Sequence, residues 1–346
     1  MTCDKYAYLF QEQKREDKTD KTIENKIGDL LRAKKDLGLA GGNKKEKQKE
    51  VDRAYEELLE VFQPHLVYHD LHWQNKQAAD DFRNKWALSK EPKQLPGIPS
   101  NAIWTTIEKP QINLNILSSC SISIQFKFTL AKSYLSRDEN LFYIIDNPVR
   151  KDKVFTRPYI AASSWKGSLR AALWQTGYKE DDMKIRRLFG NERGVEQQEM
   201  LRSGRLFFYP TFFDKVDLEV INPHDRKKRV GKNPILFECV PEGTSGYFTL
   251  LYIPFDLAGK DLAEIKQQVS DDLKIVCEGI EAMLTIYGFG AKTSSGFGLA
   301  EDDITDVCIK ASQKTKPLEF AQMKLSDLCK NLHEKVKQLF KDDCND

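Results

Sequence analysis

Asp146 is a carboxylate placed where it could do chemistry, in the segment LFYIIDNPVRKDKVF. An apolar run precedes it, an Asn-Pro turn follows it, and Arg150 and Lys151 stand next in the chain. A fixed carboxylate can bind a divalent cation such as Mg²⁺ or Mn²⁺, which a lone Asp would hold only transiently, or it can orient a hydroxyl for attack on phosphorus. The two neighbouring cations would draw a phosphate to the same place. The structural alternative is an Asp that caps the Asn-Pro turn.

A Gly-rich segment, YGFGAKTSSGFG at residues 287–298, combines backbone freedom with side chains that suit phosphate. Glycine lets backbone amides approach a ligand, and hydroxyl and ammonium groups donate to phosphate oxygens. The candidate contacts are Gly290, Lys292, Thr293, Ser294 and Ser295. The Walker order GxxxxGK[ST] is missing, which disfavours a nucleoside triphosphate site. A tight turn between a helix and a strand is the alternative.

The segment SSWKGSLRAALWQTG predicts a helix whose start could bind an anion. Ser163 or Ser164 would be the N-cap, and Gly177 would end the helix. Lys166 and Arg170 lie four residues apart and so share one helical face. Cations near the positive end of the helix dipole favour a phosphate. An ordinary capped amphipathic helix is the alternative.

The run INPHDRKKRVGKNP, residues 221–234, is strongly basic and lies between two predicted strands. It should therefore protrude as a basic arm or a long hairpin. Its composition suits a nucleic acid backbone, and an imidazole could stack on a base. The candidate contacts are His224, Arg226, Lys227, Lys228 and Arg229. A solvated loop is the alternative, since runs of charge usually face water.

The spacing of the histidines could suit a metal ion, whereas the spacing of the cysteines does not. His65, His69 and His72 could lie along one helix face and bind zinc, but their apolar neighbours favour ordinary packing. The seven cysteines are scattered and never form C-x-x-C, which fits reduced thiols better than a zinc ribbon or a disulfide framework.

Composition places the chain among soluble folded proteins. Its 346 residues include 19 Phe, 12 Tyr and 5 Trp, enough large apolar surface to exclude a wholly disordered chain. No apolar stretch of about 18 residues and no N-terminal signal pattern is present, so we expect a cytoplasmic protein without a membrane partner. Residues 150–232 carry 19 basic and 11 acidic side chains, which points to a polyanion as partner or to a solvated basic face.

The elements that must position these residues follow from periodicity. In CSISIQFKFTL, apolar residues at alternate positions predict a strand with one buried face, and residues 260–286 predict a long helix. Three more strands are predicted at GRLFFYPTFF, NPILFECV and GYFTLLYIPF. The order strand, helix, strands, helix, strand predicts an α+β fold with a helix pair on one face of a sheet.

Three regions are predicted along the chain. Residues 1–100 form a charged helical module with a Pro-rich linker, residues 101–310 form the core, and residues 311–346 form a helical tail. In the module, helical spacing over 14–62 is interrupted by LGLAGGNKKEK, which predicts a helical hairpin, and residues 74–88 predict another helix. Residues 318–343 predict the helix of the tail.

Four motifs taken in order resemble the RAMP superfamily of CRISPR-associated proteins, over about residues 118–300. They are IIDNPVRKDKVFTRPYIAASSWKGSLRAALW, RRLFGNERG, SGRLFFYPTFF and GFGAKTSSGFG. The likeness is greatest to the backbone subunits of type III CRISPR effector complexes, which polymerise along a guide RNA (crRNA). This resemblance implies a ferredoxin-like, RNA-recognition-type core with an inserted thumb hairpin.

The resemblance also implies roles for residues. The helix start at Ser163 and the loop 288–298 would line the guide RNA, and Arg187 would shape the same surface. The arm at residues 224–232 looks like the thumb that wedges between guide and target nucleotides. Asp146 falls where the family's target-RNA-cleaving Asp lies, so the implied partners are guide RNA, target RNA and other effector subunits.

Three functions stay open on these grounds. The first is a guide-RNA-binding subunit that also cuts target RNA, as an endoribonuclease with Asp146 and Mg²⁺ or Mn²⁺. The second is a scaffold that binds guide RNA and neighbouring subunits without cutting. The third is a processing nuclease, which would need a general base such as His near the Gly-rich loop, where none lies. The helical module would contact a neighbouring subunit or resemble the small helical subunit of such complexes.

Overall fold

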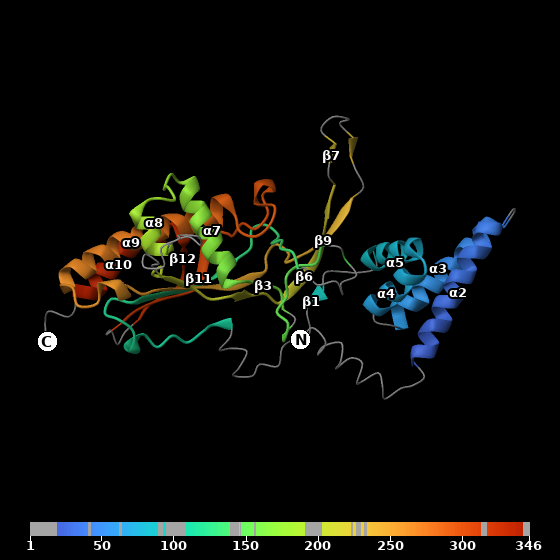
Figure 1. Ribbon diagram of the computed structural model, residues 1–346, viewed down its shortest axis with the longest axis horizontal. Coiled ribbons are helices and arrows are strands. Elements are labelled where there is room, and N and C mark those ends of the chain that lie inside the picture. The colour runs from blue at the N-terminus through green and yellow to red at the C-terminus, as the bar shows by residue number, and fades with distance from the viewer. Residues whose placement is uncertain are drawn as a thin grey trace, which may run out of the picture.

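One five-stranded antiparallel sheet forms the centre of the core in this computed structural model (Figure 1). Its strand order is β12-β11-β2-β10-β4. The strands are β2 (Ile122–Thr129), β4 (Leu206–Phe208), β10 (Ser245–Tyr252), β11 (Asp303–Ala311) and β12 (Leu318–Lys324). The structure describes residues 19–40, 43–61, 64–88, 93–94, 108–138, 145, 147–155, 157–190, 203–222, 224–225, 230–231, 234–312 and 317–341.

The connections give the sheet a ferredoxin-like topology. Without β12, the strands in spatial order are the fourth, first, third and second along the chain. Helix α7 (Ala162–Gln175) follows the first strand, and α9 (Leu262–Ala282) follows the third. Both helices lie on the same face of the sheet (Figure 1), and they pack on each other through a shared apolar core. This βαββαβ arrangement confirms the predicted α+β fold class.

Strand β2 is buried on both faces, whereas the sequence predicted one. Ile122, Ile124 and Phe126 point into the core beneath the helices, as alternation requires. On the other face Ser123 and Gln125 are 1% and 4% exposed. The reason is that the preceding segment covers this face: Gln125 Nε2 donates to the carbonyl oxygen of Pro110 at 2.9 Å.

The C-terminal residues extend the core. Helix α10 (Leu325–Lys341) confirms part of the predicted helical tail, but residues 318–324, also predicted as helix, form strand β12 on the edge of the sheet. Leu328, Leu332 and Val336 of α10 are buried in the same cluster as the sheet. The boundary predicted between residues 310 and 311 therefore falls within β11, one residue before that strand ends.

The basic arm is a long hairpin, as predicted. We call it the thumb hairpin: β6 (Lys215–Ile221) pairs antiparallel with β9 (Ile235–Cys239), and beyond them β7 (His224–Asp225) pairs with β8 (Val230–Gly231). It projects from the core in Figure 1. Residues 226–229, which include Arg226, Lys227, Lys228 and Arg229, lie outside the described residues. The short strand β1 (Lys93–Gln94) pairs with β6 at the other edge.

The predicted helical module has a core of its own. Its helices are α2 (Thr19–Leu39), α3 (Lys44–Val61), α4 (Pro64–Gln74) and α5 (Lys76–Leu88). The break between α2 and α3 matches the predicted Gly-rich interruption, and Ile27, Tyr55 and Phe82 are among its buried residues. Leu218 and Leu236 of the thumb hairpin pack against this cluster, so the module is anchored to the hairpin.

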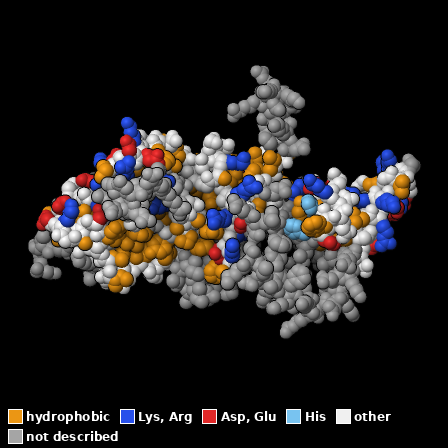
Figure 2. Space-filling view, in the orientation of Figure 1, with side chains coloured by type: hydrophobic (Ala, Val, Ile, Leu, Met, Phe, Trp, Pro, Cys, Tyr) orange, Lys and Arg blue, Asp and Glu red, His pale blue; other side chains and the backbone are white. Residues whose placement is uncertain are grey.

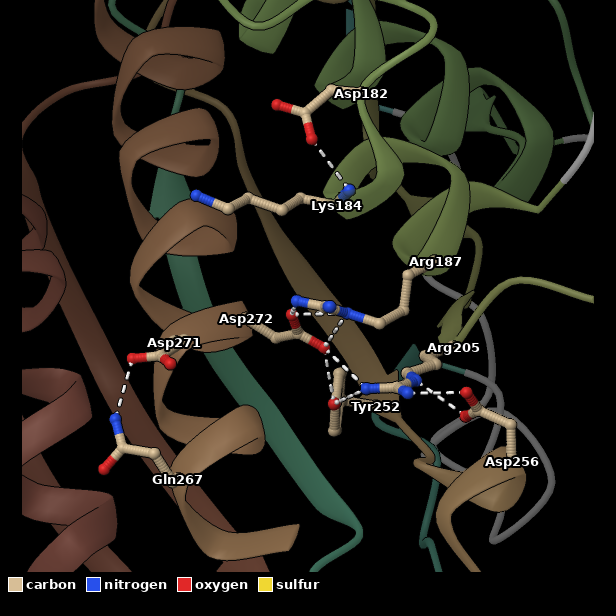
Figure 3. Close-up of polar contacts among 9 residues, drawn as sticks. All are labelled: Asp182, Lys184, Arg187, Arg205, Tyr252, Asp256, Gln267, Asp271 and Asp272. Atoms are coloured by element: carbon tan, nitrogen blue, oxygen red, sulfur yellow. Dashed lines mark hydrogen bonds and ion pairs between the residues drawn. The ribbon is translucent and has the colours of Figure 1, made fainter. Parts of the chain in front are cut away.

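A buried ion network joins the helices to the sheet (Figure 3). Asp272 on α9 is 0% exposed, and the Arg205 side chain that faces it is 2% exposed, with Nη1 at 2.9 Å from Oδ2. Tyr252 donates its hydroxyl to the same oxygen at 2.7 Å. Arg187, on α8 (Met183–Phe189), donates Nε to Asp272 Oδ1 at 2.9 Å, and Asp256 binds the outer side of Arg205. The Asp272 carboxylate thus contacts two guanidinium groups, and Asp256 supplies the second negative charge.

We expect Asp272→Asn to lower the free energy of unfolding by about 3 kcal/mol or more, because it leaves two guanidinium groups, those of Arg187 and Arg205, with only the carboxylate of Asp256. Urea unfolding followed by circular dichroism measures this. Glu264→Gln is the matched control, since it breaks the solvent-exposed pair with Lys260 and should cost less than about 1 kcal/mol. Equal effects of the two changes would contradict this role for the network.

Candidate nucleic-acid interface

The start of α7 differs from the predicted serine cap. The N-cap is Ala161, with φ −68° and ψ 149°, so Ser163 and Ser164 lie inside the first turn. Ser163 is exposed and Ser164 half-buried, while Trp165 is fully buried and fixes the turn in the core. The amides of Ser164 and Trp165 donate to the Ala161 carbonyl oxygen. Alanine offers no side-chain acceptor to the two amides before them, those of Ala162 and Ser163, which suits an external acceptor. The predicted end of the helix is confirmed at Gly177, whose φ is +108°.

Lys166 and Arg170 stand together on the face of α7, as their spacing predicts. Burial, and then the charge of Arg170, lower the pKa of Lys166. The guanidinium of Arg170 lies 5.2 Å from the centre of the Trp174 ring, which supports it. Two like charges held this close repel each other, and an anion such as a phosphate would relieve the repulsion.

The Gly-rich loop has a defined backbone conformation with short helical turns and is more than a tight turn. A turn of π-helix, residues 283–287, leads from α9 into the loop. Within the loop, Thr293–Ser295 form one turn of 3₁₀ helix. Gly298 is required, because a Cβ there would lie 1.9 Å from the Phe289 carbonyl oxygen. Lys292 itself adopts the left-handed region, with φ +58°. The chain therefore accepts backbone strain to present this exposed lysine.

Contacts of aromatic rings bring the loop, α7 and the thumb hairpin together. The rings of Trp165 and Phe289 lie 4.8 Å apart, so the loop begins beside the first turn of α7. At the other side, Lys292 Nζ lies 5.0 Å from the centre of the Phe237 ring on β9. Figure 2 shows Lys and Arg side chains gathered on the core next to the foot of the hairpin. We call the surface formed by Lys166, Arg170, Lys292 and residues 293–295 the basic platform.

Asp146 lies outside the described residues, but both of its neighbours are described. Ile145 is 4% exposed and belongs to the buried cluster of the helical module. Asn147 donates its side-chain amide to the carbonyl oxygen of Leu236 on β9 at 3.3 Å. The exposed Arg150 follows, with its guanidinium 5.5 Å from the centre of the Tyr159 ring. Ile145 and Asn147 thus lie where the module meets the thumb hairpin.

Two of the predicted RNA contacts are instead engaged in ion pairs. Lys151 Nζ lies 2.5 Å from Glu238 Oε1, with only 15% of its side chain exposed. Arg187 binds the buried Asp272 (Figure 3). Each of these cations already faces a carboxylate, so neither is counted in the basic platform, and their contacts with RNA stay a prediction.

The predicted histidine cluster lies on α4, and two of its three side chains are described. The rings of His69 and His72 lie 5.5 and 5.9 Å from that of Tyr68, while the side chain of His65 lies outside the description. The described part of the chain contains no group of three His, Cys, Asp or Glu that could hold a metal ion. None of its helices is both long and apolar enough to cross a membrane.

Phe237 and Glu238 are site residues that the sequence reasoning missed. Both lie in NPILFECV, which was interpreted only as a strand. A carboxylate within an apolar strand was a signal in itself, because a half-buried charge needs a partner. Its partners, Lys151 and the backbone of Val149, are distant in sequence and could not be identified from spacing.

Comparison with known proteins found relatives in sequence and in structure. The family model of the RAMP superfamily matches residues 100–301. A curated relative, the CRISPR system Cms endoribonuclease Csm3 of Streptococcus thermophilus, is 30% identical over 166 residues, which are 44% of this chain and 73% of the relative. A chain in a cryo-EM structure of the type III-B Cmr-beta complex bound to cognate target RNA is 18% identical, with a TM-score of 0.48, covering 84% of this chain and 99% of that one. A chain of the Csm3–Csm4 subcomplex of the type III-A interference complex is 14% identical, with a TM-score of 0.38, covering 64% and 96%. From the match over residues 100–301, the chain belongs to the RAMP superfamily.

Proposed function

We propose that this protein is a guide-RNA-binding backbone subunit of a type III CRISPR effector complex in the cytoplasm. The observation that carries the proposal is the basic platform, where the start of α7 and the Gly-rich loop meet beside the thumb hairpin. The relative in Streptococcus thermophilus, named Csm3, supports the assignment to a type III system. The partners would be guide RNA, target RNA and other subunits of the complex.

The platform suits a nucleic acid backbone more than a small molecule. Lys166, Arg170 and Lys292 supply charge, while the hydroxyls of residues 293–295 and the amides of the first helical turn supply donors. These groups contact phosphate and sugar, and they carry no information about base sequence. A subunit that must hold any guide needs this kind of contact. His224 and residues 226–229 of the thumb hairpin would lie along the same strand of RNA.

We further propose that the protein cuts target RNA with Asp146. The Csm3 relative is named an endoribonuclease. In this reaction Asp146 would orient the 2′-hydroxyl of the target for in-line attack on the adjacent phosphorus, and the 5′-oxygen of the next nucleotide would leave. Mg²⁺ or Mn²⁺ would be weakly bound, since a lone Asp supplies few of the oxygen ligands that such a cation needs. A subunit that binds guide RNA without cutting is the alternative.

The binding proposal predicts that protein purified with its partner subunits carries short RNA of repeat-derived sequence. The positive surface has no other evident ligand of this length and charge. Extraction of the RNA and sequencing measure this. Protein that is free of RNA, with an absorbance ratio typical of protein alone, would contradict the proposal.

A second prediction concerns the salt dependence of guide binding. Lys166→Ala combined with Arg170→Ala should weaken binding and reduce the slope of log affinity against log salt by about two, roughly one for each lost phosphate contact. Lys151→Ala is the matched control, because its charge is balanced by Glu238 and its loss should leave the slope unchanged. Filter binding over a salt series measures both. The platform is wrong if the double variant keeps the wild-type slope.

A third prediction concerns cleavage. Asp146→Ala should lower the cleavage rate by roughly 100-fold or more while guide and target binding stay nearly intact, because separate groups hold the RNA. EDTA should stop cleavage, and a target with a 2′-deoxy group at the scissile nucleotide should resist, since its nucleophile is gone. A gel of labelled target RNA with the assembled complex and Mg²⁺ or Mn²⁺ measures this. An undiminished product band from the Asp146→Ala complex would leave the chain as a scaffold.

A further inference from the structure

Aromatic rings, and not carboxylates, support three cations at the surface around the basic platform. In each case the charged group lies over the ring, at a distance that suits a cation–π contact. The pairs, with the distance to the ring centre, are Arg150 over Tyr159 (5.5 Å), Arg170 over Trp174 (5.2 Å) and Lys292 over Phe237 (5.0 Å). In the part of the chain that the structure describes, none of the three cations pairs with a carboxylate.

The helical module shows the contrasting arrangement, in which a cation over a ring also has a carboxylate partner. Lys34 and Lys85 both lie over the Tyr55 ring, at 5.6 and 5.4 Å from its centre. Lys34 also pairs with Asp81, and Lys85 pairs with Asp52. These charges are therefore compensated within the module. At the platform the ring is present and the carboxylate is not.

A ring holds a cation without neutralising it. The attraction comes from the negative face of the π-system, which carries no net charge. A carboxylate in the same place would supply a full negative charge and would accept the N–H donors that a phosphate needs. The ring also restricts a long side chain, so less rotamer entropy is lost when a ligand binds. A cation supported in this way is both positioned and available to an anion.

From these contacts we infer that Tyr159, Trp174 and Phe237 are positioning residues for RNA binding, each of which acts through the cation that it supports. The inference rests on the proposed binding of guide RNA. It also extends the RNA-binding surface beyond the basic platform, because Arg150 becomes a phosphate contact on the same grounds as Arg170.

Arg150 is held beside the start of α7 by its main chain as well as by the ring. Tyr159 belongs to β3 (Tyr159–Ile160), which ends just before α7 begins. The Tyr159 ring stacks on that of Phe212, with centres 5.8 Å apart, and its backbone N–H donates to the carbonyl oxygen of Arg150 at 3.1 Å. The backbone N–H of Arg150 donates to Ser136 Oγ at 2.9 Å. The exposed guanidinium therefore extends from a fixed backbone and lies over a fixed ring.

A double-mutant cycle on Trp174 and Arg170 tests the inference. Trp174 is suited to it because the ring is 37% exposed, so its replacement should leave the core intact. The full chain is prepared as wild type, Trp174→Leu, Arg170→Ala and the double variant. Filter binding of one labelled single-stranded RNA is measured over a salt series. Any sequence serves as the probe, because phosphate contacts carry no information about the bases.

We expect Trp174→Leu to weaken binding roughly threefold to tenfold with an unchanged slope of log affinity against log salt, because the phosphate contact persists but is less well positioned. Arg170→Ala should reduce the slope by about one. Adding Trp174→Leu to Arg170→Ala should weaken binding no further, since the ring acts through the arginine.

A second variant, Trp174→Glu, places a carboxylate where the ring was. Glutamate four residues after Arg170 on a helix pairs with it, so the slope should fall at least as much as in Arg170→Ala. The corresponding cycles are Tyr159→Leu with Arg150→Ala and Phe237→Leu with Lys292→Ala.

Phe320→Leu is the matched control. Lys335 Nζ lies 4.2 Å from the centre of the Phe320 ring, but the two residues belong to α10 and β12, which are not part of the platform. RNA binding by this variant should equal that of the wild type.

Three results would overturn the inference. One is wild-type affinity in Trp174→Leu, and another is a wild-type slope in Trp174→Glu. The third is an equal loss from Trp174→Leu with and without Arg170→Ala, because the ring would then contact RNA itself or support only the fold. If the wild-type chain binds RNA with no dependence on salt, the proposed guide binding fails too, and the wild-type curve alone identifies that outcome.

Discussion

The basic platform depends on the burial of one indole, that of Trp165. Its ring is 0% exposed and contacts Phe128 and Phe248 of the sheet edge to face, at 5.9 and 5.1 Å. Its Nε1 donates to Thr211 Oγ1 at 3.0 Å, so the polar atom of the ring is also satisfied. Through Phe289 the same ring supports the start of the Gly-rich loop. The side chain that fixes α7 on the sheet therefore also fixes the loop beside α7.

The lysines and arginines of the core fall into two classes. Some are available to a ligand at the surface, and others form ion pairs within the protein. Lys166 and Arg170 share a helical face on which their charges repel, and Lys292 is presented on a strained loop. Lys151 and Arg187 instead face Glu238 and Asp272. Only a cation whose charge is not already balanced gains much from a phosphate. Net charge alone, which is +2 for the whole chain, does not distinguish the two classes.

The helical module and the thumb hairpin pack together around Ile145, and the hairpin also binds Asn147. Ile145 lies in the core of the module, and Leu218 and Leu236 of the hairpin pack against that same core. A module without the family's common pattern is thus joined to the part of the core where cleavage is proposed. Its packing accounts for an apolar residue directly before Asp146, where an exposed loop would be expected to carry a polar one.

Local patterns in the sequence determined most of the elements. Alternation over residues 122–130 predicted β2, and Gly177 ends α7. Gly288, Gly290 and Gly298 of the loop occur where a Cβ would clash. Periodicity and glycine chemistry act within a few residues, so the sequence shows them directly. The open face expected for β2, the serine cap of α7 and the helix expected at residues 318–324 were wrong, since each was decided by a segment packed from elsewhere. Distant segments also decided which lysines and arginines are paired with a carboxylate. Lys151 and Glu238 are 87 residues apart, and Arg187 and Asp272 are 85 apart. Only the tertiary structure brings a distant carboxylate to a lysine or arginine, and that encounter decides which cations remain for RNA.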